Sequence, residues 1–185
     1  ADTFAEMMCW YECAIKEIRT KLEVLNAEFQ AKKSRNPIET IKSRVKKPTS
    51  IFEKMERRGY DINLETLMDK INDVAGVRVI CPFIKDIYSV ADMLASQDDI
   101  TIIELKDYIK NPKDSGYKSF HMLVSVPVFL SDSVVQTKVE IQIRTIAMDF
   151  WASLEHKIHY KFEGEAPEHI EKELIDCARM VSELD

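Results

Sequence analysis

One stretch of the sequence, residues 138–145, places three chemically capable side chains on a single side of the chain. Glu140, Gln142 and Arg144 alternate with apolar residues, which is the period of a β-strand with one buried face. A carboxylate, an amide and a guanidinium then project from the same strand face. A strand face that is merely solvated shows the same alternation, so this stretch indicates a site only where other functional groups converge on it.

A second candidate is a basic segment, residues 44–54, in which cations and a hydroxyl gather near a predicted helix start. Helix starts and clustered cations both favour the binding of a polyphosphate. The alternative is a solvated basic face. The residues concerned are Arg44, Lys46, Lys47, Ser50 and Lys54.

A third candidate pairs Asp73 with Arg78 around the start of a strongly apolar strand. Asp73 lies where the strand begins and Arg78 lies within it, so both can reach one end or one face of the sheet. A carboxylate in this place can hold Mg²⁺, which prefers one or two carboxylates together with phosphate oxygens. The alternative is an aspartate in a turn and an arginine in an ordinary ion pair.

The fourth candidate ends a long polar loop, residues 107–117. Gly116 permits close backbone approach, and Tyr117 offers an aromatic face on which a base can stack. Ser119 and His121 then alternate toward one side of the next strand. A tyrosine at a strand start more often has a packing role, so this segment indicates a binding site only when it is considered together with the other three candidate segments.

Composition limits the classes of protein that remain. The chain has 185 residues, of which 45% are hydrophobic and 31% charged, and we expect one domain over residues 1–185. No apolar run approaches the roughly 20 residues needed to cross a bilayer, and the first residues lack the pattern of a secretory signal, so we predict a cytoplasmic protein without a membrane partner. The net charge of −6 argues against a stable nucleic-acid partner.

Hydrophobic periodicity and capping signals predict an α+β fold, a mixed and mainly antiparallel β-sheet flanked by helices. We divide the chain into an N-terminal helix (1–33), a catalytic core (36–161) and a C-terminal helix (167–185). Helices are predicted over residues 3–33, 37–46, 50–59, from 63 onward, and over 84–97, 146–161 and 168–184. Strands are predicted over residues 74–81, 100–105, 119–128 and 134–144, the last two as a hairpin.

Taken together and in order, the four candidate segments resemble the RelA/SpoT-type (p)ppGpp synthetases. The length of the chain is similar to that of their short single-domain branch, the small alarmone synthetases. The resemblance covers about residues 36–161 and rests on Arg44, Lys46, Ser50, Ile51 and Lys54, on Asp73, Ala75, Gly76 and Arg78, on Asp107, Tyr108, Ile109, Gly116, Tyr117, Ser119 and His121, and on Val139 to Thr145 with Trp151, Glu155, His156, Tyr160 and Lys161.

The resemblance implies a nucleotidyltransferase-like synthetase fold and a reaction. Members of the family transfer the β,γ-pyrophosphate of ATP to the ribose 3′-hydroxyl of GDP or GTP and release AMP. By this resemblance Asp73 and Glu140 are catalytic and hold Mg²⁺, and Glu140 is also a candidate to accept the proton of the 3′-hydroxyl.

The resemblance also assigns the nucleotide contacts. Arg44 and Arg78 match the arginines that sandwich the adenine of ATP, and Tyr117 matches the tyrosine that stacks on guanine. The donor phosphates fall to Lys46, Ser50 and Lys54. The remaining contacts to the acceptor or its phosphates are assigned to Lys113, Lys118, His121, Gln142 and Arg144.

Short members of the family are commonly homotetramers, which we therefore expect here. Activation by pppGpp is not predicted, because Thr40 and Lys42 stand where the resemblance implies an aromatic and a small hydroxyl residue. One alternative is a catalytically weak regulatory protein that binds a nucleotide or RNA on the same fold; the pair Asp73 and Glu140 argues against it. A nucleotidyltransferase that moves AMP is a further alternative, which the tyrosine and arginine motifs disfavour.

Overall fold

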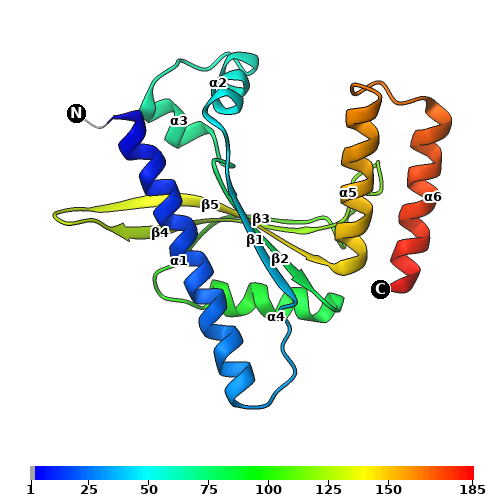
Figure 1. The fold of residues 1–185 in the computed structure, drawn as a ribbon, viewed down its shortest axis with the longest axis horizontal. Helices are drawn as coiled ribbons and strands as arrows, with labels where there is room; N and C mark the ends of the chain where they lie inside the picture. The colour runs from blue at the N-terminus through cyan, green and yellow to red at the C-terminus, as the bar shows by residue number, and fades with distance from the viewer. Residues whose placement is uncertain (1–2) are drawn as a thin grey trace.

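The computed structural model describes residues 3–185 and contains a five-stranded β-sheet with helices packed around it (Figure 1). The strands lie in the order β1-β2-β5-β4-β3; β2 and β5 are parallel, and the other neighbours are antiparallel. This arrangement confirms the predicted α+β class and its mainly antiparallel sheet. The elements are α1 (Phe4–Ala31), β1 (Thr40–Val45), α2 (Pro48–Arg57), α3 (Leu64–Lys70), β2 (Ala75–Cys81), α4 (Ile84–Ala95), β3 (Thr101–Asp107), β4 (Phe120–Phe129), β5 (Val134–Thr145), α5 (Ile146–Lys161) and α6 (Glu168–Leu184).

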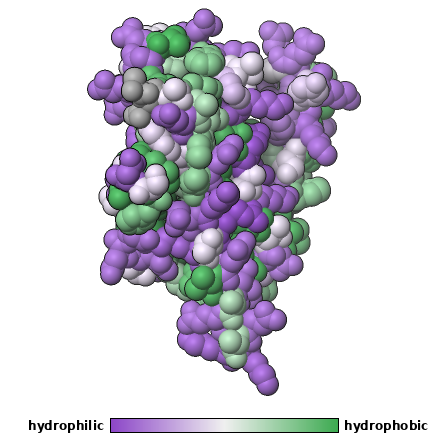
Figure 2. Space-filling model, turned by 60° about the vertical axis from the view of Figure 1, so that its left-hand side comes forward, coloured by the Kyte–Doolittle hydropathy of each residue, from purple (hydrophilic) through white to green (hydrophobic). Residues whose placement is uncertain are grey.

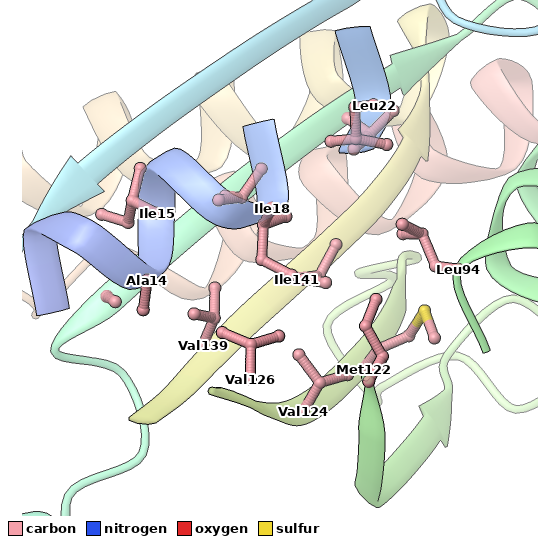
Figure 3. Packing of buried hydrophobic residues seen from close by; sticks show 14 of the residues in the cluster. Ala14, Ile15, Ile18, Leu22, Leu94, Met122, Val124, Val126, Val139 and Ile141 are labelled. Atoms are coloured by element: carbon pink, nitrogen blue, oxygen red, sulfur yellow. The ribbon is translucent and has the colours of Figure 1, made fainter. Parts of the chain in front are cut away.

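Helix α1 begins where the sequence predicts it and crosses one face of the sheet (Figure 1). Its first turn is fixed by a capping box, in which the Thr3 hydroxyl accepts from the Glu6 amide at 3.1 Å and the Glu6 carboxylate accepts from the Thr3 amide at 3.2 Å. The apolar stripe of α1 is buried against the sheet, and Figure 3 shows Ile18 pointing toward Ile141 of β5. The core therefore occupies this side of the sheet.

The sheet has a covered face and a polar face. Helices α1 and α4 both contribute to the apolar layer, where Leu94 of α4 lies near Met122 of β4 (Figure 3). Side chains alternate along a strand, so the residues between the buried ones point to the opposite face. The polar side chains of β5 therefore project away from α1.

Helices α5 and α6 pack together beside one end of the sheet and form a second apolar cluster (Figure 1). The indole N–H of Trp151 in α5 donates to the carbonyl of Leu174 in α6 at 2.8 Å, which satisfies a buried donor. Both helices match their predicted bounds, because each is a long segment of 3.6-residue periodicity with clear ends.

The predicted helix over residues 37–46 is wrong. The chain instead forms β1, an edge strand that pairs antiparallel with β2. The Asn36 side chain accepts from the Ile38 amide at 2.9 Å and so closes a local turn instead of capping a helix. Thr40, Ile41 and Val45 are β-branched and favour the extended chain, and β2 offers them a partner.

The start predicted for the next helix is also wrong. We expected Ser50 to cap it, whereas α2 begins at Pro48 with Lys47 in the cap position. Proline suits the first turn of a helix because it has no amide hydrogen to leave unsatisfied and its φ is already helical. Ser50 therefore lies within the first turn of α2.

Figure 2 shows the surface of one face of the molecule, on which hydrophilic side chains predominate and apolar ones appear in separate patches. Between residues 3 and 185, no helix combines the length and the apolar character needed to span a bilayer.

The loop before β4 is held by helix α6. Gly116 has φ +96°, and a Cβ atom added there would lie 2.6 Å from the Cβ of Ala178. Glycine is therefore required at this position both by the backbone conformation and by the close approach of the helix.

We predict that Gly116→Ala destabilises the protein by about 2–5 kcal/mol, because left-handed strain and a steric collision add together. Gly164→Ala is the matched control, since Gly164 has φ +83° and nothing within 4 Å of the added Cβ; we expect it to cost only about 1–2 kcal/mol. Unfolding in urea measures both. Equal losses in the two variants would contradict the close packing of α6 against this loop.

Candidate active site

The polar face of β5 lies at the centre of the sheet, between β2 and β4. Glu140 is in register with Gly76 of β2 and Leu123 of β4. Gln142 is in register with Arg78 of β2 and with His121 of β4. Neighbouring strands bring such residues onto one face in rows, so the candidate groups of separate segments converge here.

Glu140 lines two hollows, and the larger of these two lies on its β1 and β2 side and has a volume of about 290 Å³. Its floor is β2, where Gly76 leaves space between the longer side chains. Strand β1, the element that we expected to be helical, forms its outer wall. The lining residues are Lys42, Ser43, Arg44, Asp73, Gly76, Val77, Arg78, Glu140 and Gln142.

Asp73 is held at this hollow by two lysines. Its carboxylate accepts from Lys54 Nζ at 2.8 Å and from Lys46 Nζ at 3.0 Å. Burial is the largest influence on the carboxyl group and pushes its pKa up, but the hydrogen bonds from Lys54 and Lys46 outweigh burial and lower the pKa. Asp73 is therefore ionised at neutral pH. Ser50 is half-buried in the first turn of α2, within the same basic segment.

A smaller hollow of about 70 Å³ lies on the β3 and β4 side of Glu140. It is lined by Asn72, Glu104, Lys106, His121, Leu123 and Glu140. Glu140 lines both hollows and separates them. This position, at the boundary of two sites on one sheet face, is the central geometric feature of the candidate active site.

A chain of hydrogen bonds runs from Glu140 along β5. Gln142 Nε2 donates to Glu140 Oε1 at 2.8 Å, and Arg144 Nη2 donates to Gln142 Oε1 at 2.8 Å. The same guanidinium nitrogen donates to the Tyr117 hydroxyl at 2.7 Å. The predicted polar face is thus a connected network, and it extends to the loop before β4.

Tyr117 and His121 complete the network. The Tyr117 hydroxyl accepts from Arg144 and shares a hydrogen bond of 2.8 Å with Nε2 of His121. Burial lowers the pKa of His121 from 6.5 to about 4, and the cations Arg144, Lys113 and Lys106 act in the same direction. The ring is therefore neutral at pH 7.

Lys113 lies over the Tyr117 ring at 5.1 Å from the centroid, and the Arg144 guanidinium lies 5.3 Å from it. Cations beside an aromatic ring attract its electron-rich face. Lys113 also lies 4.9 Å from the ring of Tyr108, so it belongs to the same loop cluster.

Most of the predicted site residues converge on this face, but Lys118 does not. It lines a separate small hollow between α5 and α6 with Gly116, Trp151 and Asp185. Its neighbour Tyr117 belongs to the network of Arg144, so adjacency in sequence does not place the two side chains together.

The structure also reveals residues at the site that sequence reasoning missed. Lys42 and Ser43 were hidden by the mistaken helix, although strand alternation from Arg44 would have placed Lys42 on the same face. Asp149, in the first turn of α5, contacts both Arg78 and Arg144. A carboxylate in the first turn of the helix that follows a strand, with an arginine next to the end of that strand, is a local signal for such a contact. The other missed polar residues that line the two hollows are Asn72, Glu104 and Lys106.

Comparison with known proteins identifies the family of this chain. Residues 43–165 match the family model described as the region found in RelA/SpoT proteins. The GTP pyrophosphokinase YwaC of Bacillus subtilis is 45% identical over 175 residues, which cover 95% of this chain and 83% of that protein. The chain therefore belongs to the RelA/SpoT family.

Solved structures give the same result for the fold. The small alarmone synthetase 2 of Bacillus subtilis superimposes with a TM-score of 0.89 at 42% identity, covering 99% of this chain and 94% of that one. The small alarmone synthetase 1 of the same organism, bound to its product pppGpp, superimposes with a TM-score of 0.87 at 36% identity, covering 95% and 89%. The resemblance inferred from the motifs is thereby confirmed.

The neutral state of His121 leads to a prediction about acid stability. Its pKa is about 4 in the folded protein and about 6.5 in the unfolded chain, so protons bind preferentially to the unfolded chain between these values. Stability contributed by the neutral ring is complete above about pH 6.5 and is lost as the pH falls toward about 4. We expect His121→Gln, which keeps an acceptor for Tyr117, to reduce the loss of unfolding free energy between about pH 7 and pH 4.5 by about 1–2 kcal/mol.

The matched control is His169→Gln, because His169 is an exposed histidine of α6. Urea unfolding of the three proteins at both pH values measures the effect. Identical acid sensitivity in the wild type and His121→Gln would show that the ring is not held neutral by the fold.

Proposed function

We propose that this protein is a GTP/GDP pyrophosphokinase, which transfers the β,γ-pyrophosphate of ATP to the ribose 3′-hydroxyl of GDP or GTP. The products are ppGpp or pppGpp, and AMP. The observation that carries the proposal is the position of Glu140 between two hollows, one walled by arginines and one beside Tyr117 and His121. Direct transfer needs two nucleotides bound on either side of one reacting centre, and this face offers that arrangement.

The donor ATP is assigned to the larger hollow. Arg44 and Arg78 both line it, and planar guanidinium groups can stack on an adenine ring as lysine cannot. The triphosphate is assigned to Lys46, Lys54 and Ser50. Support comes from the start of α2, where the partial positive charge of the helix and the two lysines act together on an anion.

The acceptor nucleotide is assigned to the side of Tyr117. The guanine base is proposed to stack on the Tyr117 ring, whose hydroxyl is held by Arg144 and His121. Lys113, Gln142 and Arg144 are the proposed contacts to the ribose or its phosphates. Lys118 is assigned to this group by family resemblance alone, since it lies in the hollow beside α6.

Asp73 and Glu140 fit a magnesium ion. Both carboxylates line the larger hollow, and Asp73 is kept ionised by its lysines. Hard oxygen ligands of this kind, with phosphate oxygens completing the set, are what Mg²⁺ prefers. When bound, the ion would neutralise the negative charge that develops on the phosphoryl oxygens.

Glu140 is proposed to accept the proton during the transfer. The acceptor 3′-oxygen forms a bond to the β-phosphorus of ATP, the bond from that phosphorus to the α–β bridging oxygen breaks, and AMP leaves. One oxygen of Glu140 is fixed by Gln142, and within residues 3–185 the other has no hydrogen-bond donor, so it is free to take the 3′-hydroxyl proton. Lys46 and Lys54, with Arg144 on the acceptor side, supply fixed positive charge around the reacting phosphates.

A cytoplasmic homotetramer is the proposed form of the protein. Apolar side chains on the outside of the α5–α6 pair support self-association, among them Phe150 at 61% exposure and Met180 at 68%. Light scattering coupled to gel filtration should give about four times the mass of one chain. A monomeric mass at micromolar concentration would contradict this assembly.

The reaction is tested by incubating the protein with Mg²⁺, γ-labelled ATP and either GDP or GTP. We expect label to appear in a guanosine tetra- or pentaphosphate, together with AMP. Addition of a chelator in excess of Mg²⁺ should stop the transfer. Tight nucleotide binding without transfer under any divalent ion would refute the enzyme and favour a binding protein.

Glu140→Gln should reduce the transfer rate by about 10²–10⁴-fold, because it removes both the proton acceptor and a charged oxygen ligand. The side-chain size is kept, so the circular dichroism spectrum and melting temperature should match the wild type. Glu173→Gln, at an exposed position of α6, is the matched control and should retain full activity. Wild-type turnover in Glu140→Gln would refute the role assigned to this residue.

A further inference from the structure

Asp149 lies between two arginines of the site that come from different strands. Its Oδ1 atom is 3.4 Å from Nη1 of Arg78, in β2, and 3.3 Å from Nη1 of Arg144, in β5. The Asp149 side chain is 18% exposed, in the first turn of α5. One carboxylate oxygen is therefore shared by a residue of the proposed donor hollow and a residue of the Tyr117 network.

The two arginines depend on this contact to different degrees. Arg144 is buried and has other partners, because Ser119, Tyr117 and Gln142 all accept hydrogen bonds from it. Its guanidinium stays in place if one contact is lost. The position of Arg144 is thus over-determined by its surroundings.

Arg78 has no such support. Within residues 3–185 its contact with Asp149 is the single hydrogen bond and the single ion pair of its side chain, and its Nε–H is buried without a partner. Burial lowers the pKa of Arg78, and the nearby cations Arg144 and Arg44 lower it further, while Asp149 opposes them. Without Asp149, Arg78 would face two like charges and have no acceptor to direct it.

We propose that Asp149 is a positioning residue for the donor nucleotide, which holds the Arg78 guanidinium at the wall of the larger hollow where it meets the adenine. This inference rests on the proposed function for the identity of the ligand. Its consequence is asymmetric: loss of Asp149 should weaken the binding of ATP much more than the binding of GDP, although Asp149 touches an arginine of each side.

The test compares Asp149→Ala, Asp149→Asn and Asp149→Glu with the wild type by initial rates, varying ATP at saturating GDP and then GDP at saturating ATP. We expect Asp149→Ala to raise the KM for ATP by about three- to thirtyfold, since a charge-assisted hydrogen bond is lost. The KM for GDP should change by less than about twofold. Asp149→Asn, which keeps an oxygen acceptor, should be intermediate, and Asp149→Glu should recover part of the loss.

Asp176→Asn is the matched control, because Asp176 makes an exposed ion pair with Arg179 on α6, 3.9 Å apart. It should behave as the wild type. If Asp149→Ala does not fold, as judged by its melting temperature, the isosteric Asp149→Asn variant decides the question. Equal increases in the KM for both nucleotides, or no increase in either, would overturn the proposal.

A binding measurement separates this inference from the proposed reaction. Calorimetric titration with Mg²⁺ and the non-hydrolysable analogue α,β-methylene-ATP needs no turnover. Weaker binding of the analogue to Asp149→Ala supports the positioning role even if the wild type transfers no pyrophosphate, in which case only the function fails. Unchanged analogue affinity in a protein that transfers pyrophosphate would overturn the role of Asp149 alone.

Discussion

The parallel pairing of β2 with β5 is the constraint on which the whole site depends. Its register sets Gly76 beside Glu140 and Arg78 beside Gln142, so the larger hollow and the central carboxylate lie on the same part of the sheet. The side-chain period of a strand is two, and a slip of one residue would turn the polar set into the core. Ile141 is fully buried under α1 and makes such a slip prohibitively costly. The geometry of the polar face is therefore enforced by apolar packing on the other face.

A second constraint is electrostatic. The chain carries a net charge of −6, yet its polar sheet face gathers the cations that a polyphosphate requires. Two carboxylates reduce the repulsion among these cations in the folded protein. Asp73 forms ion pairs with two lysines, and Asp149 forms ion pairs with two arginines. Each counter-ion offsets repulsion between partly desolvated like charges, and it also directs them. The cations are thus available to bind an anionic ligand, while their repulsion of one another is kept small enough for the strands that carry them to stay paired.

Local sequence signals are sufficient to predict the long helices, and to predict which polar side chains share one face of a single strand. Periodicity alone placed Glu140, Gln142 and Arg144 on one face of β5 and gave the bounds of α5 and α6. It could not report β1, because an edge strand owes its conformation to a partner that lies elsewhere in the chain. It could not report the pairing of Arg78 with Asp149 either, which are 71 residues apart. Strand order decides which polar faces meet, and strand order is not encoded in any one strand.

The residues at the centre of the site are held by more buried contacts than the residues on its two flanks. Glu140 is carried by β5, which lies between β2 and β4 and rests on the main core. Arg44, on one flank, is carried by an edge strand with exposed side chains, and Tyr117, on the other, packs against the separate cluster of α5 and α6. Elements with fewer buried contacts open and adjust at lower free energy than the core does. The two flanks can therefore adjust while the carboxylate between them keeps its position, which is what the proposed transfer between two independently bound substrates requires.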